Sequence, residues 1–179
     1  MVKLVFILCL TFAINVHADS YDQKVNASLK DIGKQITNIE LINTEGQPKT
    51  FMDLKGTTHI VYFFASWCSP CYKSLKNIEQ IRITNDLSVN ILGVALDDDR
   101  EAVSKMLKDT GFKGEVWISK EGRVPLLNRM FGNAYKALPY VIKVDENMII
   151  KEHSYDISSK EHWEKVLVEN MSFKDSTAL

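Results

Sequence analysis

The chain has 179 residues, of which 45% are hydrophobic and 25% charged, a composition typical of a globular domain with one sizeable core. Its 22 basic and 23 acidic residues leave a formal net charge of -1 at pH 7. Because the lysines and arginines are scattered among acidic residues, the sequence does not indicate a nucleic-acid partner. No internal repeat or low-complexity tract divides the chain, and we expect a single-domain monomer.

The first 18 residues, MVKLVFILCLTFAINVHA, have the pattern of a secretory signal peptide. Lys3 precedes an apolar stretch over residues 4–14, and Val16 and Ala18 have the small-residue spacing that a signal peptidase recognises. Cleavage after Ala18 would remove Cys9 and place the mature chain in the periplasm or outside the cell, where thiols can oxidise. The apolar stretch is shorter than the roughly 20 residues of a membrane-spanning helix, so an uncleaved membrane anchor is the less favoured alternative.

Residues 19–35 are polar and lack a hydrophobic stripe, which indicates a loose lead-in to one domain over residues 36–172, followed by a tail over 173–179. Near the start of the domain lies NIELINTEGQPKTFMDLKG, in which apolar and polar residues alternate around a turn signal at residues 45–48. This pattern predicts a β-hairpin at the edge of a sheet.

A buried strand and a helix are predicted next. Residues 59–65, HIVYFFA, form a continuous apolar run rich in β-branched and aromatic residues, which is the pattern of a central strand covered on both faces. From Pro70 to about Ile83, apolar residues recur with helical spacing. Cys68 and Cys71 therefore lie where a buried strand is followed by a helix.

The remaining sequence alternates strands with helices. The expected strands are 88–96, 115–118, Tyr140–Val144 and Met148–Glu152, the last two joined by a turn at 145–147. The expected helices are 97–112, capped by Asp98 or Asp99 and ending near Gly111; 124–131; and 158–170, which starts near Ser159 and carries the apolar stripe Trp163, Val166 and Leu167. Together with the hairpin, this order predicts an α/β fold with a mixed central sheet flanked by helices.

The cysteine pair could be a structural staple, a metal site or a redox centre. A bridge between Cys68 and Cys71 closes a very short loop, so it stabilises the fold by far less than the roughly 3 kcal/mol expected for a 15-residue loop. A zinc site needs about four ligands, and the sequence contains no second CxxC and no closely spaced histidine pair. Neither staple nor metal site explains the spacing well, and we expect no metal.

Redox chemistry has a physical mechanism at this position. Cys68 is expected at or just before the first turn of the helix, where free backbone N–H groups and the helix dipole favour a thiolate over a thiol. Cys68 is then the exposed attacking sulfur, and Cys71, one turn later and more buried, resolves the mixed disulfide. Pro70 suits the first helical turn, and the small Ser69 leaves room for an incoming disulfide.

The segment VYFFASWCSPCYKSL resembles the active-site strand, turn and helix of thioredoxin-fold thiol-disulfide oxidoreductases, with Trp67 directly before Cys68. ALPYVIKVDENMII is similar to the family's cis-proline loop at Pro139, and the N-terminal hairpin resembles that of the TlpA/ResA-like secreted branch. The resemblance covers about residues 33–170. It implies that Pro139 packs beside the cysteines and that Leu138 offers backbone groups to an extended substrate, as in strand addition.

Two positions depart from the family pattern. Thioredoxin carries a buried aspartate six residues before the first cysteine, where this chain has Tyr62. The reductive haem-maturation members carry an acidic residue three positions after the second cysteine, where this chain has Ser74. A water molecule or another residue would then have to act as the proton carrier.

The resemblance implies a periplasmic thiol-disulfide oxidoreductase that exchanges disulfides with protein substrates. Cys68 and Cys71 would alternate between dithiol and disulfide, so no diffusible cofactor is needed. The TlpA/ResA-like branch favours a reductant, for cytochrome c maturation or a similar task, that a membrane electron donor of the DsbD type keeps reduced. The alternative within the class is an oxidant or isomerase of secreted proteins.

Three other function classes fit less well. Copper-handling proteins of this fold resemble CxxxC with a later histidine, whereas this chain has CxxC and no histidine near Pro139. A peroxidase of the related fold would have threonine where this chain has Ala65. A redox-inactive interaction protein would not be expected to keep the complete WCSPC motif.

Other side chains have competing interpretations. Trp67 is interpreted as a wall of the substrate groove rather than as core, whereas Trp117 and Trp163 are expected in the core. The acidic run at residues 97–99 is interpreted as helix caps and dipole partners rather than as a cation site. The histidines of the mature chain are expected on the surface or in hairpins.

Overall fold

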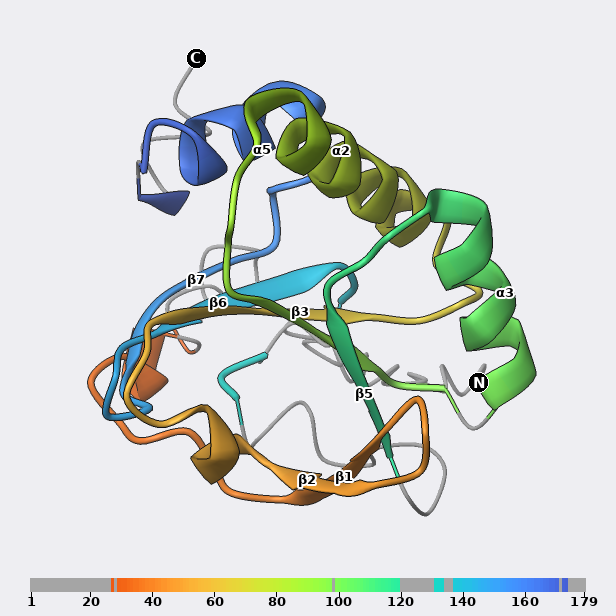
Figure 1. Cartoon of the computed structure of the whole chain (residues 1–179). Coiled ribbons are helices and arrows are strands. Elements are labelled where there is room, and N and C mark those ends of the chain that lie inside the picture. The colour runs from red at the N-terminus through yellow and green to blue at the C-terminus, as the bar shows by residue number, and fades with distance from the viewer. Residues whose placement is uncertain are drawn as a thin grey trace, which may run out of the picture.

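The computed structural model describes residues 27, 29–97, 99–119, 131–133, 137–170 and 172–173. Within these residues a seven-stranded mixed sheet has the order β2-β1-β5-β4-β3-β6-β7, and Figure 1 shows the helices packed over it. The strands are β1 Glu40–Asn43, β2 Pro48–Thr50, β3 His59–Phe64, β4 Ile91–Ala95, β5 Glu115–Ser119, β6 Tyr140–Val144 and β7 Ile150–Ser154. This is the thioredoxin-like fold expected from the sequence, with the β1–β2 hairpin at one edge.

Three α-helices lie on the same face of the sheet: α2 (Ser69–Asn85), α3 (Arg100–Thr110) and α5 (Lys160–Leu167). Two short 3₁₀ helices precede them, η1 (Leu29–Asp31) and η2 (Phe51–Leu54). The expected caps are confirmed for α3, where the Asp99 side chain accepts a hydrogen bond from the Ala102 N–H and Gly111 ends the helix in the left-handed conformation. The stripe Trp163, Val166 and Leu167 of α5 is buried as expected.

The central strand β3 is covered on both faces. Ile60, Tyr62 and Phe64 belong to the core under the helices, and Val61 and Phe63 belong to the core on the opposite face. The strand pairs in parallel with β4 and antiparallel with β6, so its backbone groups are satisfied on both sides. This explains why the run contains no polar alternation, and it fixes the point at which the chain leaves the sheet toward α2.

One expected helix lies almost wholly outside the described residues, and one expected strand starts later than expected. The helix expected over 124–131 lies outside the described residues except for its last position. The strand expected to start at Met148 starts instead at Ile150, because Met148 still belongs to the turn, with a left-handed φ of 63°. The Asp145 carboxylate accepts hydrogen bonds from the N–H groups of Asn147 and Ile149, which lengthens that turn.

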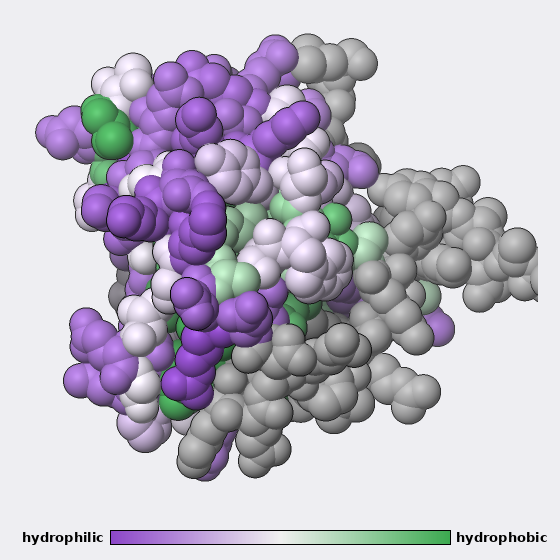
Figure 2. Space-filling model, turned by 90° about the vertical axis from the view of Figure 1, so that its right-hand side faces the viewer, coloured by the Kyte–Doolittle hydropathy of each residue, from purple (hydrophilic) through white to green (hydrophobic). Residues whose placement is uncertain are grey.

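Most of the coloured surface in Figure 2, viewed from the α3 side, is hydrophilic, with hydrophobic residues confined to small patches. The large exposed apolar side chains among the described residues are Leu29, Trp67, Ile83 and Val168. None of the helices in the described part of the chain combines the length and hydrophobicity that crossing a bilayer requires.

His153 on β7 is less exposed than the sequence suggested. Both of its ring nitrogens are buried, and neither has a hydrogen-bond partner within the described part of the chain. The ring lies among aromatic side chains, with its centroid 6.0 Å from those of Tyr140 and Tyr155. Desolvation lowers the pKa of His153, and the nearby Asp31 carboxylate opposes part of this shift.

We predict that His153 makes the fold less stable in mild acid. Its pKa is lower in the folded than in the unfolded chain, so the unfolded chain binds the proton more readily as the pH falls below about 6.5. The stability from the neutral ring is therefore complete above that pH and is lost as the pH falls toward the folded-state pKa. Urea unfolding at pH 7.5 and 5.0 should show this loss in the wild type and a smaller loss in His153→Gln.

His59→Gln is the matched control, because the His59 ring contacts the Thr57 carbonyl in an exposed position. It should keep the pH dependence of the wild type. Equal pH dependence in His153→Gln and the wild type would show that buried His153 is not responsible.

Candidate active site

Cys68 occupies the N-cap of α2, directly after the loop that leaves β3. Its sulfur forms a disulfide with Cys71, with 5.2 Å between the two Cα atoms, and also accepts a hydrogen bond from the Cys71 N–H at 3.3 Å. Ser69 and Pro70 are the first two residues of the helix, and both are exposed. The helix N-terminus therefore directs N–H groups and positive dipole potential at the Cys68 sulfur, which favours its thiolate once the bond opens.

Cys71 is more buried than Cys68, as expected, but the difference between them is smaller than expected. Cys71 is fully buried and Cys68 is 5% exposed, whereas an exposed attacking sulfur was expected. The Cys68 N–H donates to the Ala65 carbonyl at 3.0 Å, which folds the 65–68 loop back over the helix terminus. Only a small part of Cys68 remains open to a partner in the disulfide form.

Asp97 holds this loop from the end of β4. Its side chain is 3% exposed, and its carboxylate accepts hydrogen bonds from both the Ser66 N–H and the Ser66 hydroxyl. Asp97 therefore binds the active-site loop and does not cap a helix, in contrast to the expectation for the acidic run. No group of three or more potential metal ligands occurs within the described part of the chain. No sequence pattern predicts this role, because Ser66 and Asp97 are far apart in the chain.

The Leu138–Pro139 peptide bond is cis, as expected from the resemblance. Pro139 is buried, Leu138 is half-buried, and both directly precede β6. Since Tyr140 pairs with Phe63 across the antiparallel β3–β6 ladder, continuing the register places Pro139 opposite Phe64, at the end of β3 from which the active-site loop departs. The fold thus brings the proline loop and the cysteine loop to the same end of the sheet.

Trp67 projects outward next to the cysteines, with 74% of its surface exposed. It lines a groove of about 240 Å³ with Tyr72 of α2 and with Met106 and Lys105 of α3. Trp67 is therefore not a core residue, in line with the favoured interpretation, and Trp117 and Trp163 are fully buried as expected. Leu138 and Pro139 are not among the residues lining this groove.

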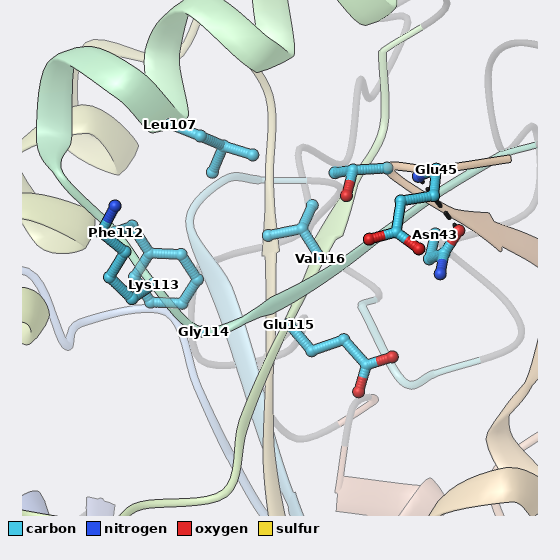
Figure 3. A pocket seen from close by; sticks show the side chains of 9 residues that line it. Asn43, Glu45, Leu107, Phe112, Lys113, Gly114, Glu115 and Val116 are labelled. Carbon is cyan, nitrogen blue, oxygen red and sulfur yellow. Dashed lines mark hydrogen bonds between the residues drawn. The ribbon is translucent and has the colours of Figure 1, made fainter. Parts of the chain in front are cut away.

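A larger pocket of about 380 Å³ lies elsewhere, between the β1–β2 turn and the start of β5. Figure 3 shows Glu45, Lys113 and Glu115 around it, with Leu107, Phe112 and Val116 on its apolar side. Because β3, β4 and β5 are parallel, the start of β5 and the end of β3 lie at opposite ends of the sheet. This pocket is therefore not part of the cysteine site.

The family model described as Redoxin matches residues 31–169. The chain belongs to the Redoxin family. Within this family, the chain carries two cysteines in CxxC spacing, Cys68 and Cys71, which form a disulfide.

The chain is also similar to distant curated relatives. The thiol-disulfide oxidoreductase ResA of Bacillus thuringiensis subsp. konkukian (strain 97-27) is 27% identical over 95 residues, covering 52% of this chain and 55% of the relative. A ResA from Bacillus anthracis is 28% identical over 94 residues, covering 52% of this chain and 54% of the relative. The chain spans about half the length of the curated relatives it matches.

Solved structures confirm the fold. A putative protein disulfide isomerase from Bacteroides thetaiotaomicron has a TM-score of 0.62 at 20% identity, covering 80% of this chain and 90% of that one. A putative thiol:disulfide interchange protein DsbE from Chlorobium tepidum has a TM-score of 0.61 at 22% identity, covering 78% and 96%. The fold therefore covers most of the chain, beyond the segment matched by the curated relatives.

We predict that Asp97→Ala loosens the active-site loop. Removing an almost fully buried carboxylate that accepts two hydrogen bonds should lower the free energy of unfolding by about 2 kcal/mol. The Ser66 amide should also lose protection, because its acceptor is gone. Residue-resolved hydrogen exchange should show its exchange rate rising at least tenfold.

Asp99→Ala provides a control from the same acidic run. It removes the α3 cap and should cost about 1 kcal/mol without changing protection at Ser66. Unchanged Ser66 exchange in Asp97→Ala would contradict the assigned contact.

Proposed function

We propose that this chain is a periplasmic thiol-disulfide oxidoreductase that acts as a reductant of protein disulfides. The observation that carries the proposal is the Cys68–Cys71 pair at the N-terminus of α2. A sulfur at that position is activated as a nucleophile by the helix terminus, and the second sulfur lies within bonding distance for resolution.

The exchange proceeds in two balanced steps. The Cys68 thiolate of the reduced protein attacks one sulfur of a substrate disulfide, breaking that S–S bond and releasing the other sulfur as a thiolate. The Cys71 thiolate then attacks the Cys68 sulfur, forming the Cys68–Cys71 disulfide and releasing the second substrate sulfur. Two electrons pass to the substrate. The cysteines lose two protons in total, and the two substrate sulfurs take up two.

The substrate is proposed to approach from the end of the sheet where Trp67, Leu138 and Pro139 lie. Half-buried Leu138 precedes the first residue of β6, and its backbone groups could pair with an extended substrate segment. The exposed Trp67 offers a large rigid contact surface at low entropic cost. These contacts would position a protein segment rather than a small molecule.

The proposed direction of electron flow is supported by the similarity to ResA proteins and by the resemblance to the TlpA/ResA-like branch. A protein that is oxidised in each cycle needs an electron source, and we propose a membrane electron donor of the DsbD type. The signal-like segment over residues 1–18 supports a location where such a donor and oxidised substrates coexist.

We predict a reduction potential at or below about -230 mV for the Cys68/Cys71 pair, in the range of reductants rather than the roughly -120 mV of a strong oxidant. The measurement equilibrates the protein with glutathione buffers and traps free thiols. A value near -120 mV would instead establish the alternative function, an oxidant of secreted proteins. Protein that never exchanges with glutathione would contradict the whole proposal.

We also predict that the two cysteines have unequal roles. Cys71→Ser should accumulate a mixed disulfide through Cys68 with a protein disulfide such as insulin, because the resolving sulfur is missing. Cys68→Ser should form at least tenfold less adduct, since Cys71 is fully buried. Non-reducing electrophoresis and mass spectrometry measure both, and equal adduct formation by the two variants would refute the assignment of Cys68 as the attacking sulfur.

A further inference from the structure

Two buried hydroxyl groups near the cysteine pair lack hydrogen-bond partners. Tyr62 on β3 and Ser74 on α2 are both fully buried, and neither hydroxyl makes a hydrogen bond of normal length and angle within the described part of the chain. Tyr140 is equally buried, but its hydroxyl donates to the Phe131 carbonyl at 2.7 Å. Lack of a hydrogen-bond partner is therefore specific to the Tyr62 hydroxyl and is not common to the buried tyrosines of the described residues.

The two hydroxyls and Cys71 belong to one region under the helices. Tyr62 and Cys71 are members of the same core cluster, and Ser74 lies three residues after Cys71 on α2, where helical side chains are neighbours. Burial raises the pKa of Tyr62, and the side chain of Ser74 acts on the phenol group and opposes part of this rise. Ser74 therefore neighbours Cys71 along α2 and Tyr62 across the core.

Stability does not explain these two side chains. A buried hydroxyl without a partner costs about 1–3 kcal/mol, and phenylalanine and alanine would fill similar space without that cost. The Tyr62 ring does contribute to packing, lying 5.7 Å from Trp163 and 6.1 Å from Phe64 between ring centroids, but a phenylalanine ring would do the same. Packing in the disulfide form therefore does not account for the hydroxyl groups of Tyr62 and Ser74.

Opening the disulfide changes what these groups can contact. The Cys71 sulfur then carries either a proton or a negative charge in the core, and a charge there is costly without donors. The geometry points to Ser74 as the hydrogen-bond donor to the Cys71 thiolate, with the Tyr62 hydroxyl donating in turn to the Ser74 oxygen. This inference rests on the proposed function, because it assigns the two hydroxyls to the resolving step of that exchange.

Each hydroxyl keeps its own proton in this arrangement. The raised pKa of Tyr62 keeps its hydroxyl protonated and so able to donate. Hydrogen bonds to the charged form of Cys71 lower its pKa, which increases the thiolate available to attack the mixed disulfide. Ser74 touches the reacting sulfur, whereas Tyr62 acts through Ser74 and is a positioning residue.

The test measures the pKa of Cys71 in the Cys68→Ser background of the full chain. Iodoacetamide alkylation is followed against pH, with Cys71 resolved from Cys9 by peptide mass spectrometry. Adding Ser74→Ala should raise the Cys71 pKa by about one unit, which is about a tenfold loss of thiolate below the pKa. Tyr62→Phe should raise it by less, and the double variant should match Ser74→Ala.

Tyr140→Phe is the matched control, because it removes a buried tyrosine hydroxyl from the opposite face of the sheet. It should lower the melting temperature of the disulfide form, since the Phe131 carbonyl loses its donor, and leave the Cys71 pKa unchanged. Tyr62→Phe should maintain or raise that melting temperature, because it removes an unsatisfied group. This opposite sign separates a role in the reduced state from a merely structural one.

The outcomes distinguish this inference from the proposed function. If the wild type exchanges with glutathione but the Cys71 pKa is the same in Ser74→Ala, Tyr62→Phe and the parent, the inference is wrong and the function stands. If the wild type does not exchange but the pKa rises as expected, the contact is correct and the function is wrong. An equal rise in Tyr140→Phe would also overturn the inference, because the effect would not be local.

Discussion

The pairing of β3 between β4 and β6 is the constraint on which the active site depends. Both neighbours hold the strand over nearly its whole length, so the chain must leave the sheet at a fixed point after Phe64. Four residues later the N-cap of α2 is a cysteine. The reactive sulfur is thus positioned by backbone hydrogen bonds in the most buried part of the molecule, while the loop that carries it needs only a few contacts of its own.

Those contacts come from neighbouring strands. Asp97, just after β4, fixes Ser66 from one side, and Pro139, just before β6, lies at the same end of the sheet on the other side. Each residue lies at the active-site end of the sheet because its strand is paired with β3. A buried carboxylate costs less when it accepts hydrogen bonds from a backbone N–H and a hydroxyl, so the two bonds from Ser66 lower the cost of burying Asp97.

Sequence patterns predicted the elements whose signals are local. The apolar run at 59–65, the caps Asp99 and Gly111, and the stripe of α5 all follow from spacing and side-chain type, and the structure confirms them. The WCSPC motif likewise indicated where Cys68 and Pro70 would lie. What could not be predicted depends on distant residues meeting: the Ser66–Asp97 contact, the limited exposure of Cys68, and the extra length of the turn before β7, which a side-chain carboxylate stabilises.

The positions Tyr62 and Ser74 depart from the family pattern, and only the fold shows how the two departures are related. In the sequence they are two separate positions without the expected acidic residue, whereas in the fold they are adjacent and fully buried. A carboxylate near a buried thiol would raise its pKa by charge repulsion, whereas a hydroxyl donor would lower it. A hydroxyl in place of an acidic residue at either position would therefore reverse the direction of the influence on Cys71, and the resolving thiolate would be stabilised by donors rather than supplied by a base.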